Sequence, residues 1–369
     1  MEELFYITRV RIPTEKAHGL QIVKMCEAYS VCGKKVTLVI PKRKNNIKET
    51  LEEYYKINKS FDVRYIATYV LITNRRFIGR FLFWYESVIF IFKVLALKIN
   101  TKALIITRSI EVAFILNLVG RKVVLEVHDI PKSLSKLYIF LLRKIKFIVC
   151  TSQGLKSKLT EFGISNVLVA PNAIDESFLH LNQDRVITKD SCGIPKDKII
   201  LMYIGSLASW KGVETLLAAV TLLPTHFAVV IAGGTSEEVS GLKIKHPQVI
   251  FLGSTPTHLL PEYQQLADIL IIPNNPREAV SSVYTSPIKL FAHLTSNKPI
   301  LVTNMPSIRE VVSEREVFFF DGSTKDLVKK CSSIMSDKHE IKTRVANAYE
   351  LVASNTWKNR AHKILDFTK

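Results

Sequence analysis

The chain has 369 residues, of which 47% are hydrophobic and 23% charged, and a net charge of +18. This is the composition of a globular protein long enough for two domains, and it excludes a disordered chain. The five cysteines stand singly without a CxxC pair, so neither a zinc site nor a disulfide framework is indicated, and a reducing cytoplasm is expected. The acidic first residues predict a strand of the fold and not a secretion signal. The most apolar segment, residues 77–100, is interrupted by Arg80, Glu86 and Lys93, which predicts a packed helix and not a membrane span.

The positive charge is concentrated in the first half of the chain. Residues 1–172 carry 29 lysines and arginines against 13 acidic residues, whereas residues 173–369 carry 22 against 20. Such a field favours an anionic partner, namely a lipid surface, a nucleic acid or a phosphorylated acceptor. The alternative is a basic surface that only keeps the protein soluble. Nucleic acid is the weakest of the partners, because the sequence contains no recognition motif for it.

Short apolar segments alternate with stretches of helical length along the whole chain. This alternation predicts an α/β protein whose parallel sheets are covered by helices on both faces. Pro171 and Asn172 end the first run, so we predict two doubly wound Rossmann-like domains over residues 1–172 and 173–350. A C-terminal helix over residues 351–369 is expected to pack back toward the first domain. The predicted strands are 4–10, 34–40, 61–67, 103–108, 122–128 and 146–152, then 198–206, 227–234, 248–254, 269–274, 298–304 and 316–320.

Ligands of open α/β sheets bind outside the carboxyl ends of the strands, so the two domains are expected to face each other across a cleft. In the loop after the first strand, Gly19 precedes a predicted helix. One glycine is a weak phosphate signal, and the absence of GxGxxG and GxxxxGKS disfavours a nicotinamide dehydrogenase and a P-loop kinase. His128 and Asp129 end the strand over 122–128, where side chains enter a cleft. A purely structural histidine remains the alternative.

Three loops of the second half point to a phosphate group. In "YIGSLASWKGVETLL" a strand ends at Gly205, Lys211 lies in the loop and a helix begins near Val213; in "IAGG" two glycines allow a ligand to approach the backbone. In "SPIKLFAHL", Ser286 suits a helix N-cap and Pro287 the first helical position. Lys289 then places a cation at the positive end of the helix dipole, which suits a bound anion. A solvated Lys289 is the alternative.

Taken in order, these segments resemble family 4 of the retaining glycosyltransferases, which have the two-domain GT-B fold. The resemblance covers nearly the whole chain. It is carried by "PTEKAHGLQIVKMCEA", "ITRSIEVAFIL", "VVLEVHD", "APNAID", "YIGSLASWKGVETLL", "IAGG", "FLGSTP", "YTSPIKLFAHLTSNKPILVTNMPSIREVV" and "TWKNRAHKIL".

The resemblance implies that the second domain binds a nucleotide-sugar donor and that the first binds the acceptor. It implies that His128 contacts the transferred sugar, that Lys211 and Lys289 hold the diphosphate, and that Thr255 lies where backbone reads the base. Neither a metal ion nor a cofactor is implied, because the lysines and the helix dipole offset the charge of the leaving group. The implied donor-binding set is Gly19, Ser206, Lys211, Gly233, Gly234, Thr255, Thr285, Ser286, Pro287, Ile288 and Lys289.

The sequence departs from the family pattern at three positions. Tyr284 and Ala292 stand where the family commonly carries two glutamates, and Ser206 stands where many members have an arginine beside the phosphate. The second glutamate bonds the ribose in the family, and an alanine offers no such acceptor. Donor binding is therefore weakened, rerouted through His293, or lost.

The expected function is transfer of a sugar, with retention, to a glycan or lipid-linked acceptor at the cytoplasmic membrane face, in surface polysaccharide or glycolipid synthesis. The alternative is a weakened or inactive homologue that acts as a scaffold or partner subunit. Membrane attachment is expected from residues 132–149, which have the composition of a helix on an anionic interface; simple cover of the sheet is the other reading. The basic residues are Lys132, Lys136, Arg143, Lys144 and Lys146, with Arg75, Arg76 and Arg80 beside a second apolar stretch.

Overall fold

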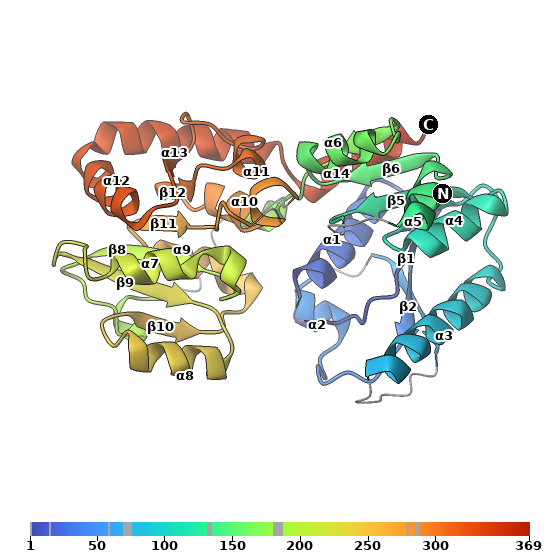
Figure 1. The fold of residues 1–369 in the computed structure, drawn as a ribbon, viewed down its shortest axis with the longest axis horizontal. Helices are drawn as coiled ribbons and strands as arrows, with labels where there is room; N and C mark the ends of the chain where they lie inside the picture. Colours follow the sequence, from blue (N-terminus) through green and yellow to red (C-terminus); the bar gives the residue numbers. More distant parts are fainter. Residues whose placement is uncertain are drawn as a thin grey trace. The chain divides into compact units, whose positions relative to one another are not determined.

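The chain folds into two compact units (Figure 1). The computed structural model describes residues 2–14, 16–57, 60–68, 76–130, 135–179, 187–278, 280–284 and 288–369. Unit 1 comprises Met1–Thr151, Leu155–Ala170 and Trp357–Lys369, and unit 2 comprises Ser152–Gly154 and Pro171–Thr356.

Unit 1 is built on a seven-stranded parallel sheet in the order β3-β2-β1-β4-β5-β6-β7. The chain moves outward from β1 in one direction and then restarts on its other side at β4, which is the reversal of a doubly wound fold. The strands are β1 (Glu3–Ile7), β2 (Lys35–Lys42), β3 (Asp62–Ala67), β4 (Leu104–Thr107), β5 (Lys122–Val127), β6 (Phe147–Cys150) and β7 (Val167–Val169). The helices are α1 (Ala17–Val31), α2 (Leu51–Tyr55), α3 (Arg76–Leu95), α4 (Ile110–Leu118), α5 (Lys136–Arg143), α6 (Gln153–Glu161) and α14 (Trp357–Phe367).

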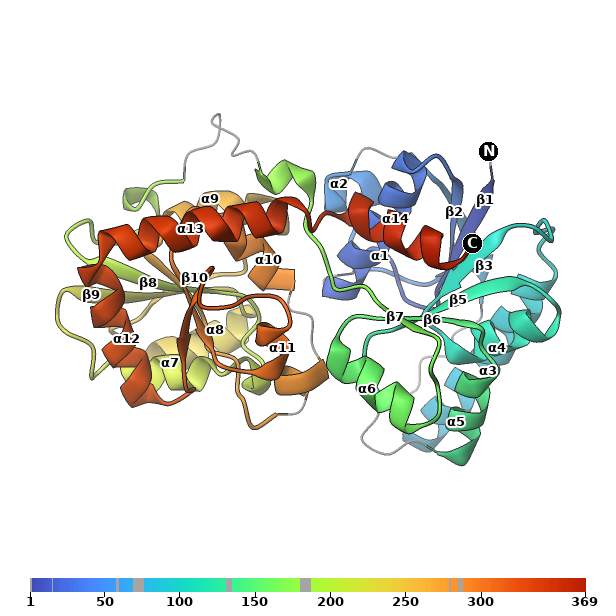
Figure 2. The same cartoon turned by 90° about the horizontal axis from the view of Figure 1, so that it is seen from above.

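The last helix, α14, belongs to unit 1 although it follows unit 2 in the sequence. It packs against α1, beside which it lies in Figure 2. Trp357, Ala361 and Ile364 are its buried apolar residues. The helix predicted over residues 351–369 is interrupted. The preceding helix, α13, ends at Ala353, and the side-chain amide of Asn355 donates to the carbonyl of Leu351.

Unit 2 is built on a six-stranded parallel sheet in the order β10-β9-β8-β11-β12-β13. Its strands are β8 (Ile199–Ile204), β9 (Phe227–Ala232), β10 (Ile250–Gly253), β11 (Ile269–Ile272), β12 (Ile300–Thr303) and β13 (Phe318–Phe320). Its α-helices are α7 (Val213–Ala219), α8 (Ser236–Lys245), α9 (Leu260–Gln265), α10 (Ile288–Leu294), α11 (Pro306–Arg309), α12 (Thr324–Ser336) and α13 (Lys338–Ala353).

Helices cover both faces of the second sheet and enclose two separate cores. One core joins the sheet to α9, α10 and α13, and the other joins it to α7, α8 and α12. Strands β11 and β12 are buried at every position, because a parallel sheet between two helical layers has no wet face. The fold class predicted from the alternation of strands and helices is confirmed, and each of the twelve predicted strands overlaps one of the observed strands.

Candidate functional site

Lys211 and Lys289 come together at the carboxyl end of β8 in unit 2. Lys211 ends a 3-10 turn over Ser209–Lys211, and its Nζ lies 3.6 Å from the centre of the Trp210 ring. Lys289 lies in the first turn of α10, and its Nζ donates to the Tyr203 hydroxyl at 2.9 Å. No carboxylate in the described part of unit 2 forms an ion pair with either lysine. Two adjacent cations without an anion between them form a site suited to a doubly charged anionic ligand.

Burial changes the ionisation of both lysines. It lowers the pKa of Lys211 to about 8. It also lowers the pKa of Lys289 well below its ordinary value, and the charge of Lys211 lowers it further. The positive charge at this site is therefore unfavourable until an anion arrives, and a bound anion would restore protonation.

Glycines shape the backbone around these lysines. A Cβ on Gly205, whose φ is +149°, would lie 2.7 Å from Lys289 Nζ. A Cβ on Gly233 would lie 2.0 Å from the carbonyl oxygen of Gly205, and one on Gly234 2.5 Å from a methyl carbon of Leu207. The close approach that these glycines permit is thus made to the protein's own backbone and side chains. The carbonyl of Ser206 accepts a hydrogen bond from Tyr203 at 2.6 Å.

The rest of the predicted donor-binding set is only partly described. Ile288 is the first residue of α10, and Thr255 is a half-buried residue of the loop after β10. Thr285, Ser286 and Pro287, and with them the predicted N-cap, lie outside the described residues.

His293 is buried inside unit 2, and its surroundings argue against a role in ligand binding. Its side chain is fully buried, its Nδ1 lies 2.9 Å from Nε2 of Gln264, and that amide also donates to the carbonyl of Ala292 at 3.0 Å. Burial, followed by the charge of Lys289, lowers the pKa of His293 to about 3, so the ring is neutral. The hypothesis that His293 replaces the missing ribose acceptor is therefore disfavoured. Gln264 was not singled out from the sequence, because a glutamine at a helix end resembles a solvated residue.

His128 lies directly after β5 in unit 1, beside the buried carboxylate of Glu126. The two residues are on one face of the strand because side chains alternate, and Nε2 of His128 is 3.8 Å from Oε2 of Glu126. Oε1 of Glu126 accepts from Arg360 Nη1 at 2.9 Å, and Oε2 accepts from the Tyr6 hydroxyl at 2.5 Å. Arg108 Nε lies 3.8 Å from the same oxygen.

The ionisation of this group keeps His128 neutral. Burial and the charge of Arg108 lower the pKa of His128 to about 4, although Glu126 acts in the opposite direction. Burial alone would raise the pKa of Glu126, but Arg360, His128 and Arg108 outweigh it and hold that pKa well below its ordinary value. A neutral imidazole at the carboxyl edge of the sheet can exchange hydrogen bonds with a hydroxyl group. In the sequence, the feature that indicates this buried polar network is a glutamate within the otherwise apolar segment "VVLEVH".

Gly19 is explained by packing within unit 1. A Cβ at this position would lie 2.2 Å from the Tyr55 hydroxyl and 2.5 Å from a carbon of Thr14. That hydroxyl accepts from the amide of Thr14 at 2.9 Å and donates to its carbonyl at 3.1 Å. The glycine makes room for this contact between the loop after β1 and α2.

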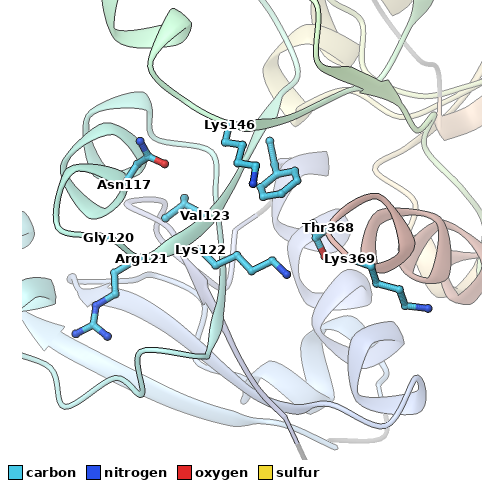
Figure 3. A pocket seen from close by; sticks show the side chains of 9 residues that line it. Asn117, Gly120, Arg121, Lys122, Val123, Lys146, Thr368 and Lys369 are labelled. Atoms are coloured by element: carbon cyan, nitrogen blue, oxygen red, sulfur yellow. The ribbon is translucent and has the colours of Figure 1, made fainter.

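A cavity of about 240 Å³ opens at the opposite, amino edge of the sheet of unit 1 (Figure 3). Arg121, Lys122, Lys146 and Lys369 are among its lining residues. None of the predicted site residues lines it, and strand amino ends are not where open α/β sheets place their ligands.

The described residues contain no cluster of three metal-ligating side chains and no helix able to cross a bilayer.

Comparisons with known proteins agree with this architecture. Residues 184–351 match the family model described as glycosyl transferases group 1. A putative teichuronic acid biosynthesis glycosyltransferase, TuaH of Bacillus subtilis, is 23% identical over 238 residues, which are 62% of this chain and 58% of that protein. The match therefore spans less than two thirds of the length of that relative.

Solved structures resemble the chain over nearly its whole length. Sucrose-phosphate synthase from Thermosynechococcus elongatus has a TM-score of 0.76 at 16% identity and covers 99% of this chain and 98% of its own. Anabaena HepE in complex with UDP has a TM-score of 0.73 at 15% identity, with 99% of both chains covered. A TarM mutant of S. aureus, in complex with UDP and saccharide ligands, has a TM-score of 0.74 at 8% identity and full coverage of both chains. The two sheets are those of the GT-B fold.

Proposed function

We propose that this chain is a glycosyltransferase that moves a sugar, with retention, from a nucleotide-diphosphate donor to a glycan or lipid-linked acceptor in polysaccharide or glycolipid synthesis. The observation that carries the proposal is the pair Lys211, which is buried, and Lys289, which is half-buried. Neither lysine has an anionic partner among the described residues of unit 2. This pair lies inside the segment that matches the glycosyl transferase model. The teichuronic acid relative and the UDP complexes of similar structures support the same class of reaction.

The two lysines would act on the leaving group. Breaking the sugar–phosphate bond leaves negative charge on the diphosphate, and preorganised cations in a desolvated site stabilise such charge more strongly than water does. Each charge-assisted contact contributes about 1.5–3 kcal/mol. The lysines would supply this stabilisation without a metal ion. The neutral ring of His128 would hydrogen-bond a hydroxyl of the transferred sugar.

A scaffold or partner subunit that keeps the fold without turnover is the second candidate. It is favoured by Ala292, which is 2% exposed and has only a methyl group where the family pattern has the ribose acceptor. The neighbouring residue His293 is buried, so it does not supply the missing contact to the ribose. Slow hydrolysis of a donor nucleotide sugar by the isolated protein would favour the enzyme over the scaffold.

The proposal is tested with nucleoside diphosphates of different bases, using calorimetry on the wild type and on Lys211→Ala and Lys289→Ala. We expect each variant to bind the diphosphate about 10-fold to 100-fold more weakly, because one charge-assisted contact is lost. A nucleoside without phosphates should be insensitive to both changes. Lys245→Ala, at the exposed end of α8, is the matched control. If both site variants bind as tightly as the wild type, the lysines do not form a phosphate site.

The proposed place of action is the cytoplasmic face of a membrane, with attachment through α5. Leu137 and Phe140 on this helix are 66% and 51% exposed, and Lys144 Nζ lies 5.6 Å from the centre of the Phe140 ring. Apolar side chains flanked by cations suit an anionic bilayer surface. Of the other basic residues in this prediction, Lys132 and Arg75 lie outside the described residues, as do the side chains of Arg76 and Arg80.

A further inference from the structure

Three adjacent strands of unit 1 are each followed by an arginine. Arg43 comes directly after β2, Arg9 two residues after β1 and Arg108 directly after β4. These parallel strands are neighbours in the order β2-β1-β4, and β5 with His128 comes next. The arginines therefore form a row along the carboxyl edge of the sheet, where open α/β sheets bind ligands. We call Arg43, Arg9 and Arg108 the arginine row.

The carboxylates that hold two of these arginines lie deeper than the arginines themselves. Arg43 donates through Nε and Nη2 to one oxygen of Glu86, at 3.0 and 2.6 Å. The side chain of Arg43 is 24% exposed and that of Glu86 is 6% exposed. Arg108 and Glu126 show the same order, with 14% against 0%. The row is therefore positive on its outer side at Arg43 and Arg108. At Arg9 the order is reversed, because its partner Glu111 is 49% exposed and the arginine 12%.

The row is also held in place before any ligand binds. Arg9 donates to the hydroxyl of Ser87 and lies 3.7 Å from the carboxylate of Glu111. Ser87 follows Glu86 on α3, so one turn of that helix anchors both Arg9 and Arg43. Because these contacts restrict the side chains, little rotamer entropy remains to be lost when a ligand binds.

Hydrogen-bond donors remain unused beside Arg108. This arginine donates through Nη2 to Oε1 of Gln21, yet its buried Nε has no hydrogen-bond partner among the described residues, and neither does Nε2 of Gln21. Glu126 cannot fully neutralise Arg108, because its single negative charge is shared with Arg360, which lies closer to it, at 2.9 Å against 3.8 Å. Unused donors and surplus positive charge suit a ligand group that is anionic and only accepts hydrogen bonds.

We propose that the acceptor saccharide bound by unit 1 carries carboxylate or phosphate groups and that the arginine row binds them. The inference rests on the proposed function, since it identifies the chemical class of the acceptor. The planar fork of a guanidinium group matches the oxygen spacing of both anions. Neighbouring strands are about 4.8 Å apart, so a row over three strands extends about 10 Å and can contact more than one charged group. An acidic oligosaccharide fits this row better than a single small anion.

The test compares three probes for binding to the full chain at low salt. Trigalacturonic acid carries carboxylates, glycerol 3-phosphate carries a phosphate, and maltotriose is neutral. We expect trigalacturonic acid or glycerol 3-phosphate to bind at least about tenfold more tightly than maltotriose. Each of the two that exceeds maltotriose shows an anion that the row accepts, and the tighter binder serves as the anionic probe for the variants. Binding of that probe should be unchanged in Lys211→Ala, which separates this site from the lysine pair of unit 2.

The deciding variant is the double substitution Arg43→Gln with Glu86→Gln. The double substitution leaves the net charge unchanged and avoids a buried carboxylate without a partner, so the fold is preserved. The row nevertheless loses the positive charge of Arg43. We expect it to weaken the anionic probe about tenfold or more. Arg344→Gln with Glu340→Gln, a similar pair on α13 of unit 2, is the control.

The outcomes separate this inference from the proposed function. Equal binding of all three probes, binding of none, or wild-type binding by the double variant would each overturn the role of the arginine row. Nucleoside-diphosphate binding is measured on the same samples. If the diphosphate binds while the anionic preference is absent, only this inference fails. If the diphosphate does not bind while the anionic preference is present, the proposed function fails and the row remains an anion site.

Discussion

The lowered pKa of Lys211 couples binding of the proposed ligand to the uptake of a proton. Its pKa of about 8 results from burial and lies below the ordinary value of 10.5. An unfolded chain therefore binds more protons than the folded one between about pH 8 and 10.5, so this residue makes the unliganded protein more stable as pH rises through that window. A bound diphosphate would raise the same pKa, so ligand affinity has the opposite dependence on pH.

We predict that nucleoside-diphosphate binding takes up a proton near pH 8.5 and weakens as the pH rises further, by up to about tenfold per pH unit for each proton. Lys289 contributes in the same direction, because burial and the charge of Lys211 lower its pKa as well. Calorimetry in two buffers with different ionisation enthalpies measures the uptake. Lys211→Arg should reduce it, since arginine keeps its proton. A binding heat that is identical in both buffers would contradict this account.

At the scale of elements, α14 is joined to the sheet of unit 1 by a buried ion pair. Arg360 of α14 bonds Glu126 of β5 at 2.9 Å, with side-chain exposures of 3% and 0%. Arg360 Nε also donates to the carbonyl of Ala170 at 3.2 Å. The pair therefore connects the last helix to the strand that carries His128.

We predict that Arg360→Met destabilises unit 1 by about 3–5 kcal/mol, because it leaves the Glu126 carboxylate buried without its principal partner. Adding Glu126→Gln should recover much of this loss, since a neutral amide costs less to bury than a carboxylate. Chemical denaturation of the single and double variants measures both effects. A single variant as stable as the wild type would mean that water or Arg108 compensates the carboxylate.

The helix α5 carries the prediction of membrane attachment. We expect the protein to sediment with vesicles that contain anionic lipid and to be released as salt rises, because each nearby cation contributes about 1 kcal/mol that salt screens. Leu137→Ser with Phe140→Ser should reduce sedimentation, since it removes the apolar side chains that would enter the interface. Leu222→Ser, at a 59% exposed residue of unit 2, is the control. Equal partition to neutral and anionic vesicles would remove the membrane from the proposal.

At the scale of the whole molecule, the chain crosses from unit 1 to unit 2 and returns at its end. We predict that a chain ending at Thr356 keeps unit 2 folded but lowers the melting temperature of unit 1 by about 10 °C or more, because several kcal/mol of apolar burial against α1 is lost. Scanning calorimetry with and without a nucleoside diphosphate assigns the transitions, since the ligand should raise only that of unit 2. A truncated protein that melts like the full chain would show that α14 is dispensable.

The sequence by itself determined the fold class and the position of most strands, because alternating apolar and helical segments report local burial. It also indicated Lys211 and Lys289, since a cation at the start of a helix or in a strand-end loop is a local signal. Only the tertiary structure decided which distant residues meet. Glu126 contacts Tyr6, 120 positions away, and Arg360, 234 positions away, because the sheet order places β1 and β5 on either side of β4 and α14 returns to unit 1. The arginine row has the same cause: its members are far apart in the chain and become neighbours only when β2, β1 and β4 pair.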